Sequence, residues 1–127
     1  MGVILDTNAL SATADNSPGI TEALSKADPA AIPVIVLGEY RFGVAQSRKR
    51  IDLEEWLVKS LPAFRILEVT MDTADYYADL RVELKRAGTP IPSNDIWIAA
   101  LSRQHRMPVL SRDRHFDTVA GLRRIDW

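Results

Sequence analysis

The chain has 127 residues, of which 46% are hydrophobic and 26% charged, a composition typical of one folded domain with a sizeable core. It contains no cysteine, so disulfides, thiolate nucleophiles and cysteine metal sites are excluded, and any metal must bind oxygen atoms or the two histidines. A formal net charge of −1 excludes a uniformly basic nucleic-acid binder.

No apolar run approaches the roughly 20 residues that a membrane-spanning helix needs. No basic start followed by an apolar stretch suggests export either. The sequence has no repeat, linker or low-complexity tract. We therefore expect a cytoplasmic protein with no membrane partner, folded as a single domain over residues 1–127.

The first eight residues join a short apolar run to a carboxylate. Residues 3–5 predict a buried strand, and Asp6 follows at its C-terminal end. In open α/β sheets, ligands bind outside the carboxyl ends of the strands, so Asp6 lies where chemistry would be done. Taken alone, however, an aspartate in this position is better explained as the cap of the next helix.

Two short helices are predicted next, over residues 9–14 and from Pro18 to about residue 27. Ser17 and Pro18 fit the N-cap and the first position of the second helix. Residues 32–37 are a β-branched apolar run that predicts a second buried strand, with a proline at its start. Glu39 would then lie just past that strand, at the head of a helix.

The middle of the chain carries clear helix signals. Asp52 and Glu55 fit an N-cap and its capping-box partner, and the helix should end before residue 62. A third strand is predicted over residues 66–69. Thr70 then caps the longest helix, which Gly88 ends, and we assign this helix no chemistry.

Asp95 lies in the first turn of a predicted helix that begins at residue 93 and that Arg106 and Pro108 end. The start of this helix is apolar on all sides, as in a buried helix. The carboxylate of Asp95 is therefore held close to a dry interior, where unpaired charges are rare. Stabilisation by the helix dipole explains Asp95 about as well as a function does. A fourth strand at residues 109–110 leads into Asp113, and a last strand is predicted around residues 123–126.

Short strands that alternate with helices predict a parallel sheet of about five strands, covered on both faces. Right-handed crossovers bring the C-terminal ends of parallel strands to one edge. Four carboxylates could meet there, and without a cation they would repel one another. Oxygen ligands without cysteine favour Mg²⁺ or Mn²⁺, and such a site suits hydrolysis of a phosphodiester by metal-activated water.

Arginine is about three times as frequent as lysine and occurs in clusters. Its planar guanidinium matches phosphate, so Arg112 and Arg114, which flank Asp113, are candidate RNA-binding residues. A merely solvated, charged face would explain these arginines equally well.

Four segments together resemble the PIN-domain nucleases in order and spacing, most closely the VapC-type toxins of bacterial toxin–antitoxin modules. They are residues 5–8 (LDTN), 36–43 (VLGEYRFG), 94–100 (NDIWIAA) and 111–116 (SRDRHF). The resemblance covers essentially the whole chain. It implies a PIN-like three-layer α/β/α fold around the parallel sheet, and one nuclease domain over residues 1–127.

The resemblance also implies roles for single residues. The acidic metal-binding quartet corresponds to Asp6, Glu39, Asp95 and Asp113. Asp6 and Asp95 would be its most direct ligands.

Candidate supporting residues surround the quartet. Ser111 matches a small hydroxyl residue that supports the acidic cluster, and Asn8 matches the polar residue after the first aspartate. Asp117 matches a position that is acidic in some relatives. We interpret Phe116 as a packing residue and His115 as a turn residue, not as a catalytic base.

The function implied by the resemblance is that of a Mg²⁺-dependent endoribonuclease, with Mn²⁺ able to substitute. The implied partners are RNA as substrate, a second copy in a homodimer, and a VapB-type antitoxin that masks the site and tethers the pair to operator DNA.

Three other protein classes share parts of this pattern. A phosphatase of the haloacid-dehalogenase type needs an aspartate as acid/base two residues after the first, where this chain has Asn8. A receiver domain needs a phosphorylated aspartate after the third strand, which here leads to Glu68 and Thr70. A catalytically inactive PIN-like module that binds RNA or a partner stays open, and metal-dependent RNA cleavage would separate it from a nuclease.

Overall fold

A computed structural model describes all residues from 1 to 127. Five parallel strands form one sheet in the order β3-β2-β1-β4-β5. The strands are β1 (Val3–Leu5), β2 (Ala30–Pro33), β3 (Arg65–Leu67), β4 (Val109–Leu110) and β5 (Arg124–Ile125). The predicted parallel sheet of about five short strands is confirmed.

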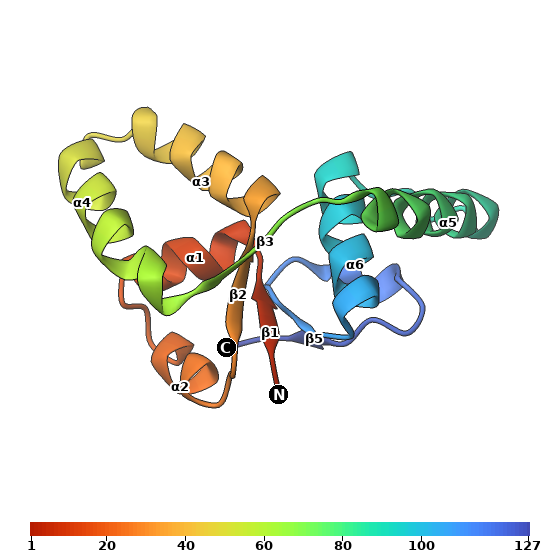
Figure 1. Ribbon diagram of the computed structural model, residues 1–127, viewed down its shortest axis with the longest axis horizontal. Coiled ribbons are helices and arrows are strands. Elements are labelled where there is room, and N and C mark those ends of the chain that lie inside the picture. Colours follow the sequence, from red (N-terminus) through yellow and green to blue (C-terminus); the bar gives the residue numbers. More distant parts are fainter.

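Six α-helices and two short 3-10 helices connect the strands. They are α1 (Thr7–Ala14), α2 (Ile20–Ser25), α3 (Val34–Ala45), α4 (Arg50–Ser60), η1 (Leu61–Ala63), α5 (Met71–Ala87), α6 (Ser93–His105) and η2 (Arg114–Thr118). Figure 1 shows α1 to α4 on one side of the sheet and α5 and α6 on the other, which confirms the three-layer architecture. No helix combines the length and the apolar character needed to cross a lipid bilayer.

Both faces of the sheet are buried, because side chains alternate along a strand. In β1, Val3 and Leu5 join the apolar cluster that includes residues of α1 and α2. Ile4 points to the opposite face, where it joins the larger cluster with Ile98 and Leu101 of α6. The central strand thus lies between two apolar layers, and its C-terminal end can place a side chain at the rim of a dry interior.

The strand order reverses beside β1. The chain builds β1, β2 and β3 outward on one side and then returns to place β4 on the other side of β1. The connections after β1 and β4 therefore leave in opposite directions, and open α/β sheets bind their ligands at the carboxyl ends of such strands. Asp6 and Ser111 are the residues that directly follow β1 and β4.

Local end signals predicted α5 correctly. The backbone N–H of Thr70 donates to Oγ1 of Thr73 at 3.0 Å, in a capping box. Gly88 adopts a left-handed conformation with φ of 71° and closes the helix. Both interactions join residues close in sequence, so a sequence pattern can predict them.

The predicted strand over residues 32–37 is wrong for residues 34–37. The strand ends at Pro33, and α3 begins at Val34. An apolar run does not by itself distinguish a buried strand from a buried helix. Val36, Tyr40 and Val44 are all buried, at the four-residue spacing of one helix face. Packing of that face favours the helix.

Two predicted helix starts are also wrong. The backbone N–H of Ser17 donates to the carbonyl of Ala12 at 2.9 Å, so Ser17 closes α1, and α2 begins only after Gly19 with φ of 86°. In the next helix, Asp52 is in the first turn and does not cap it, because α4 already begins at Arg50. Tertiary contacts outweigh these local preferences.

Candidate metal centre

Asp6 lies at the end of the central strand and is almost fully buried, with 5% of its surface exposed. Its Oδ1 accepts a 2.8 Å hydrogen bond from the backbone N–H of Thr7, and it is the N-cap of α1. Its Oδ2 accepts a 2.7 Å hydrogen bond from the hydroxyl of Ser111. Asp6 therefore caps α1 and also lies at the end of the sheet where ligands bind, so the two interpretations of this residue are compatible.

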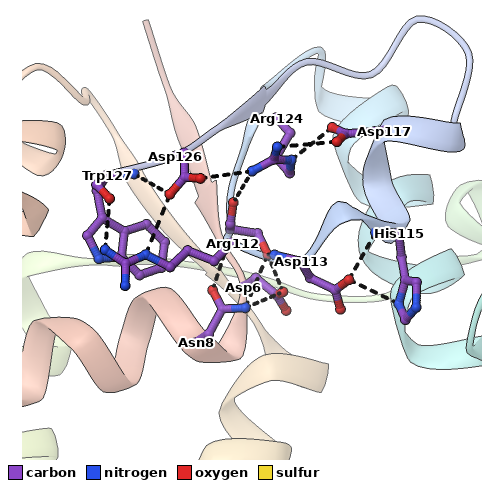
Figure 2. Close-up of polar contacts among 10 residues, drawn as sticks. Asp6, Asn8, Arg112, Asp113, His115, Asp117, Arg124, Asp126 and Trp127 are labelled. Atoms are coloured by element: carbon purple, nitrogen blue, oxygen red, sulfur yellow. Dashed lines mark hydrogen bonds and ion pairs between the residues drawn. The ribbon is translucent and has the colours of Figure 1, made fainter.

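Two of the three predicted supporting residues, Ser111 and Asn8, join the ends of β1 and β4. Ser111 is fully buried, and its Oγ also accepts a 2.9 Å hydrogen bond from the backbone N–H of Asp113. The amide of Asn8 lies 3.4 Å from Oδ2 of Asp6 and 3.3 Å from Oγ of Ser111. Figure 2 shows Asn8 and Asp113 beside Asp6. This network holds Asp6 and Asp113 in fixed relative positions.

Asp95 and Asp113 meet at the ring of His115. Asp95 lies in the first turn of α6, and Asp113 is the N-cap of η2. Nδ1 of His115 lies 3.0 Å from Oδ2 of Asp95 and 3.1 Å from Oδ1 of Asp113. One ligand atom from each of these three residues lies within 4.8 Å of the other two. The contact of Asp113 with His115 is drawn in Figure 2.

The carboxylates affect one another electrostatically. Burial raises the pKa of Asp6, and the charge of Asp113 raises it further, although hydrogen bonds from Ser111 and Thr7 oppose the rise. Burial likewise raises the pKa of Asp95, and the charges of Asp6 and Asp113 add to it. The hydrogen bond with Asp95 raises the pKa of His115. The site thus gathers negative charge that a cation would stabilise.

Glu39 is placed differently from the sequence-based prediction. It lies in the second turn of α3, not at the head of a helix that follows a longer strand. Its Oε1 accepts a 3.2 Å hydrogen bond from the hydroxyl of Thr7. It is not among the three residues whose ligand atoms gather within 4.8 Å. Glu39 therefore adjoins Asp6 through Thr7, and the structure does not bring it to the group formed by Asp95, Asp113 and His115.

Asp117 is paired with an arginine. Its two carboxylate oxygens accept hydrogen bonds of 2.8 and 3.2 Å from Nε and Nη2 of Arg124 in β5. Nη1 of Arg124 also donates to the backbone carbonyl of Ser111 at 3.1 Å. The pairing with Arg124 lowers the pKa of Asp117. Asp117 thus connects η2 to β5, and Arg124 extends the connection to the end of β4; Figure 2 shows the paired side chains of Asp117 and Arg124.

The two candidate RNA-binding arginines differ in their contacts. Arg112 donates from Nη2 to the backbone oxygen of Trp127 at 2.8 Å, and its guanidinium carbon lies 4.5 Å from the centre of the Trp127 ring. Its Nε lies 3.5 Å from Oδ1 of Asp126. The side chain of Arg114 is exposed and makes no hydrogen bond or ion pair, and its charge contributes to the lowered pKa of Asp117. Arg112 is therefore occupied by the C-terminal residues, whereas Arg114 is free.

The sequence predicted His115 as a turn residue and did not predict that its ring lies in the acidic cluster. His115 does lie in the short helix η2, but its ring returns to the acidic cluster. One signal was available: His115 follows Asp113 by two residues, and its backbone N–H donates to Oδ1 of Asp113 at 2.9 Å. An aspartate that caps a turn brings the side chains of that turn close to its own carboxylate.

The donor set fits a divalent cation. Two carboxylates and one imidazole nitrogen are available, and the chain has no cysteine to compete. Asp6, which the sequence predicts as a direct ligand, is not one of these three residues and interacts with Asp95 and Asp113 through its charge. Such oxygen-rich sets bind Mg²⁺ and Mn²⁺, and an imidazole nitrogen is compatible with transition metals.

Comparison with known proteins supports the same interpretation. The family model described as PIN domain matches residues 3–122. Ribonuclease VapC5 of Mycobacterium tuberculosis is 30% identical over 125 residues, which cover 97% of this chain and 91% of the relative. Ribonuclease VapC2 of Rickettsia felis is 34% identical over 129 residues, covering 98% and 96%.

Solved structures agree with this result. The chain superimposes with a TM-score of 0.90 on VapBC2 from Rickettsia felis bound to a DNA fragment from its promoter, at 26% identity and with 100% and 99% of the two chains covered. The TM-score against FitAcB from Neisseria gonorrhoeae is 0.86, at 31% identity with 97% and 96% covered. With a family match over nearly its whole length, the chain belongs to the PIN domain family, alongside the VapC ribonucleases.

Proposed function

We propose that this chain is the toxin of a VapBC-type toxin–antitoxin module and acts as an endoribonuclease that requires Mg²⁺, with Mn²⁺ able to substitute. The observation that carries the proposal is the grouping of Asp95 and Asp113 within 4.8 Å of each other and of His115, with Asp6 joined to Asp113 through the hydroxyl of Ser111. Family membership and the ribonuclease relatives support the same activity.

Each acidic residue has a distinct part in this proposal. Asp95 and Asp113 would hold the metal ion, and Asp6 would add its charge from the buried end of β1. A bound divalent ion would activate water and neutralise the charge of the phosphodiester. The hydrogen bonds of Ser111 and Asn8 hold Asp6 and Asp113 in fixed positions relative to each other. We assign Glu39 to contacts with the substrate beside Asp6, because the hydroxyl of Thr7 orients its carboxylate there.

The amide of Asn8 disfavours the phosphatase alternative. Its nitrogen faces Asp6 and Ser111, and its oxygen accepts a 3.3 Å hydrogen bond from the backbone N–H of Arg112. An amide held in this way cannot act as the acid/base that a phosphatase of that type needs.

Partners are part of the proposal. Related structures are described as complexes, one of them bound to promoter DNA. We assign this chain a VapB-type antitoxin, a homodimeric state, and operator binding in complex with that antitoxin, all in the cytoplasm. The nuclease domain spans residues 1–127. Induced expression should arrest growth, and co-expression of the adjacent gene should relieve the arrest.

Cleavage of RNA by the purified chain tests the activity. We expect cleavage of single-stranded or looped RNA with Mg²⁺ or Mn²⁺, none in excess chelator, and none by Asp95→Asn. Attack by water should leave a 5′-phosphate and a 3′-hydroxyl. Products with a 2′,3′-cyclic phosphate would contradict the proposal, and binding of RNA without any cleavage would favour the inactive module.

A further inference from the structure

His115 offers a nitrogen donor inside the acidic cluster. Its Nδ1 lies 3.0 Å from Oδ2 of Asp95 and 3.1 Å from Oδ1 of Asp113. A single ring N–H can reach both oxygen atoms only as a shared, bifurcated hydrogen bond, which is weaker to each, whereas one metal ion can bind both oxygens and the nitrogen. Hydrogen bonding alone therefore satisfies this arrangement only in part.

The separations between donor atoms match those around a metal ion. Divalent first-row ions bind imidazole nitrogen and carboxylate oxygen at about 2.0 to 2.2 Å, so two ligands at right angles lie about 3 Å apart. The separations of 3.0 and 3.1 Å are of this size.

The backbone of η2 keeps the ring in this place. The N–H of His115 donates to Oδ1 of Asp113 at 2.9 Å, and its carbonyl accepts a 2.8 Å hydrogen bond from the hydroxyl of Thr118. Its side chain is half exposed, so a metal ion can reach the ring without any rearrangement of the core.

We infer that His115 is a ligand of the metal ion together with Asp95 and Asp113, and that its nitrogen makes the site bind Mn²⁺ more tightly than Mg²⁺, while either ion supports the proposed activity. The inference rests on the proposed function, because it assumes that a divalent ion binds this cluster. Mg²⁺ strongly favours oxygen ligands, whereas affinity for imidazole rises through the transition series. Glu39 does not supply this ligand, since its carboxylate is directed to Thr7.

Electron spin-echo spectroscopy of the protein loaded with Mn²⁺ tests the inference without RNA. The chain has only two histidines, so His105 at the end of α6 provides the matched control. We expect nitrogen coupling to Mn²⁺ in the wild type and in His105→Ala, and its loss in His115→Ala. Calorimetric titration should show Mn²⁺ affinity falling about tenfold or more in His115→Ala, and Mg²⁺ affinity falling by a smaller factor.

The outcomes separate this inference from the proposed function. Mn²⁺ that binds without nitrogen coupling, or an equal loss of affinity for both ions in His115→Ala, would overturn the role of His115. If the wild type still cleaves RNA with Mg²⁺ in that case, the proposed function stands. Nitrogen coupling that depends on His115, in a protein that cleaves no RNA, would support the ligand and overturn the activity.

Discussion

The hydroxyl of Ser111 donates a 2.7 Å hydrogen bond to Oδ2 of Asp6, although 105 positions separate the two residues. Both side chains are buried. The contact joins the carboxyl ends of β1 and β4, the two strands at which the sheet order reverses. The two residues therefore anchor the site at the ends of two adjacent central strands.

Replacement of Ser111 by alanine removes a hydrogen bond from a buried carboxylate. Such a loss costs about 1 to 3 kcal/mol of unfolding free energy. Urea unfolding in chelator should show this loss for Ser111→Ala. Ser25→Ala is the control, because Ser25 bonds only to the carbonyl of Glu22 on the surface. An equal effect of the two substitutions would show that the Ser111 contact adds nothing.

Asp95→Asn should separate function from folding. Burial and the charges of Asp6 and Asp113 raise the pKa of Asp95, so its ionised form is disfavoured without a cation. In chelator the variant should melt no lower than the wild type. Mg²⁺ should raise the melting temperature of the wild type and leave the variant nearly unchanged.

The alternative role of Asp95 gives a different result in the same melts. If Asp95 only stabilises the helix terminus, its loss should cost about 0.3 to 1 kcal/mol, and Mg²⁺ should act equally on both proteins. That pattern would remove Asp95 from the site.

The two histidines should titrate on opposite sides of the ordinary histidine pKa of about 6.5. The hydrogen bond with Asp95 raises the pKa of His115, whereas burial and the nearby Arg65 lower the pKa of His105. The pairing of His115 thus stabilises the fold below its unfolded pKa, and this contribution disappears as the pH rises through the raised folded pKa.

NMR titration of the ring signals in chelator measures both values. Asp95→Asn should move the midpoint of His115 downward and leave that of His105 unchanged. A midpoint of His115 that does not respond to the substitution would mean that the contact with Asp95 is absent in solution.

Asp113 and Asp117 should differ in metal binding. Asp113 faces His115 in the cluster, whereas both oxygens of Asp117 are occupied by Arg124. Calorimetry should therefore show that Asp113→Asn loses most Mn²⁺ affinity and that Asp117→Asn keeps it. A loss of similar size in Asp117→Asn would place Asp117 among the ligands.

Arg114 should contribute more to RNA affinity than Arg112. Arg114 is free, and its replacement by alanine should lower the salt dependence of RNA binding by about one unit of slope. Arg112→Ala should change the slope less, because this guanidinium contacts Trp127 and Asp126. Both arginine substitutions are made in the catalytically inactive Asp95→Asn protein, and RNA affinity is measured at several salt concentrations. Equal slopes in all three proteins would assign the arginines to a solvated face.

The sequence by itself determined the features that depend on near neighbours. The capping of α5 by Thr70 and its end at Gly88 involve residues within one turn, so local preference decides them. The alternation of strands and helices predicted the parallel sheet, and this topology placed Asp6 and Asp113 at one edge. The resemblance to PIN-domain nucleases then predicted the family, which the comparisons confirm.

Only the tertiary structure decided the details of the site. Glu39 is directed to Thr7 across 32 positions, and His115 reaches Asp95 across 20. The boundary between β2 and α3 at Pro33 likewise depends on which faces of the apolar run find partners. Such contacts join residues far apart in sequence, and their energies appear only when the layers pack, so no local pattern encodes them.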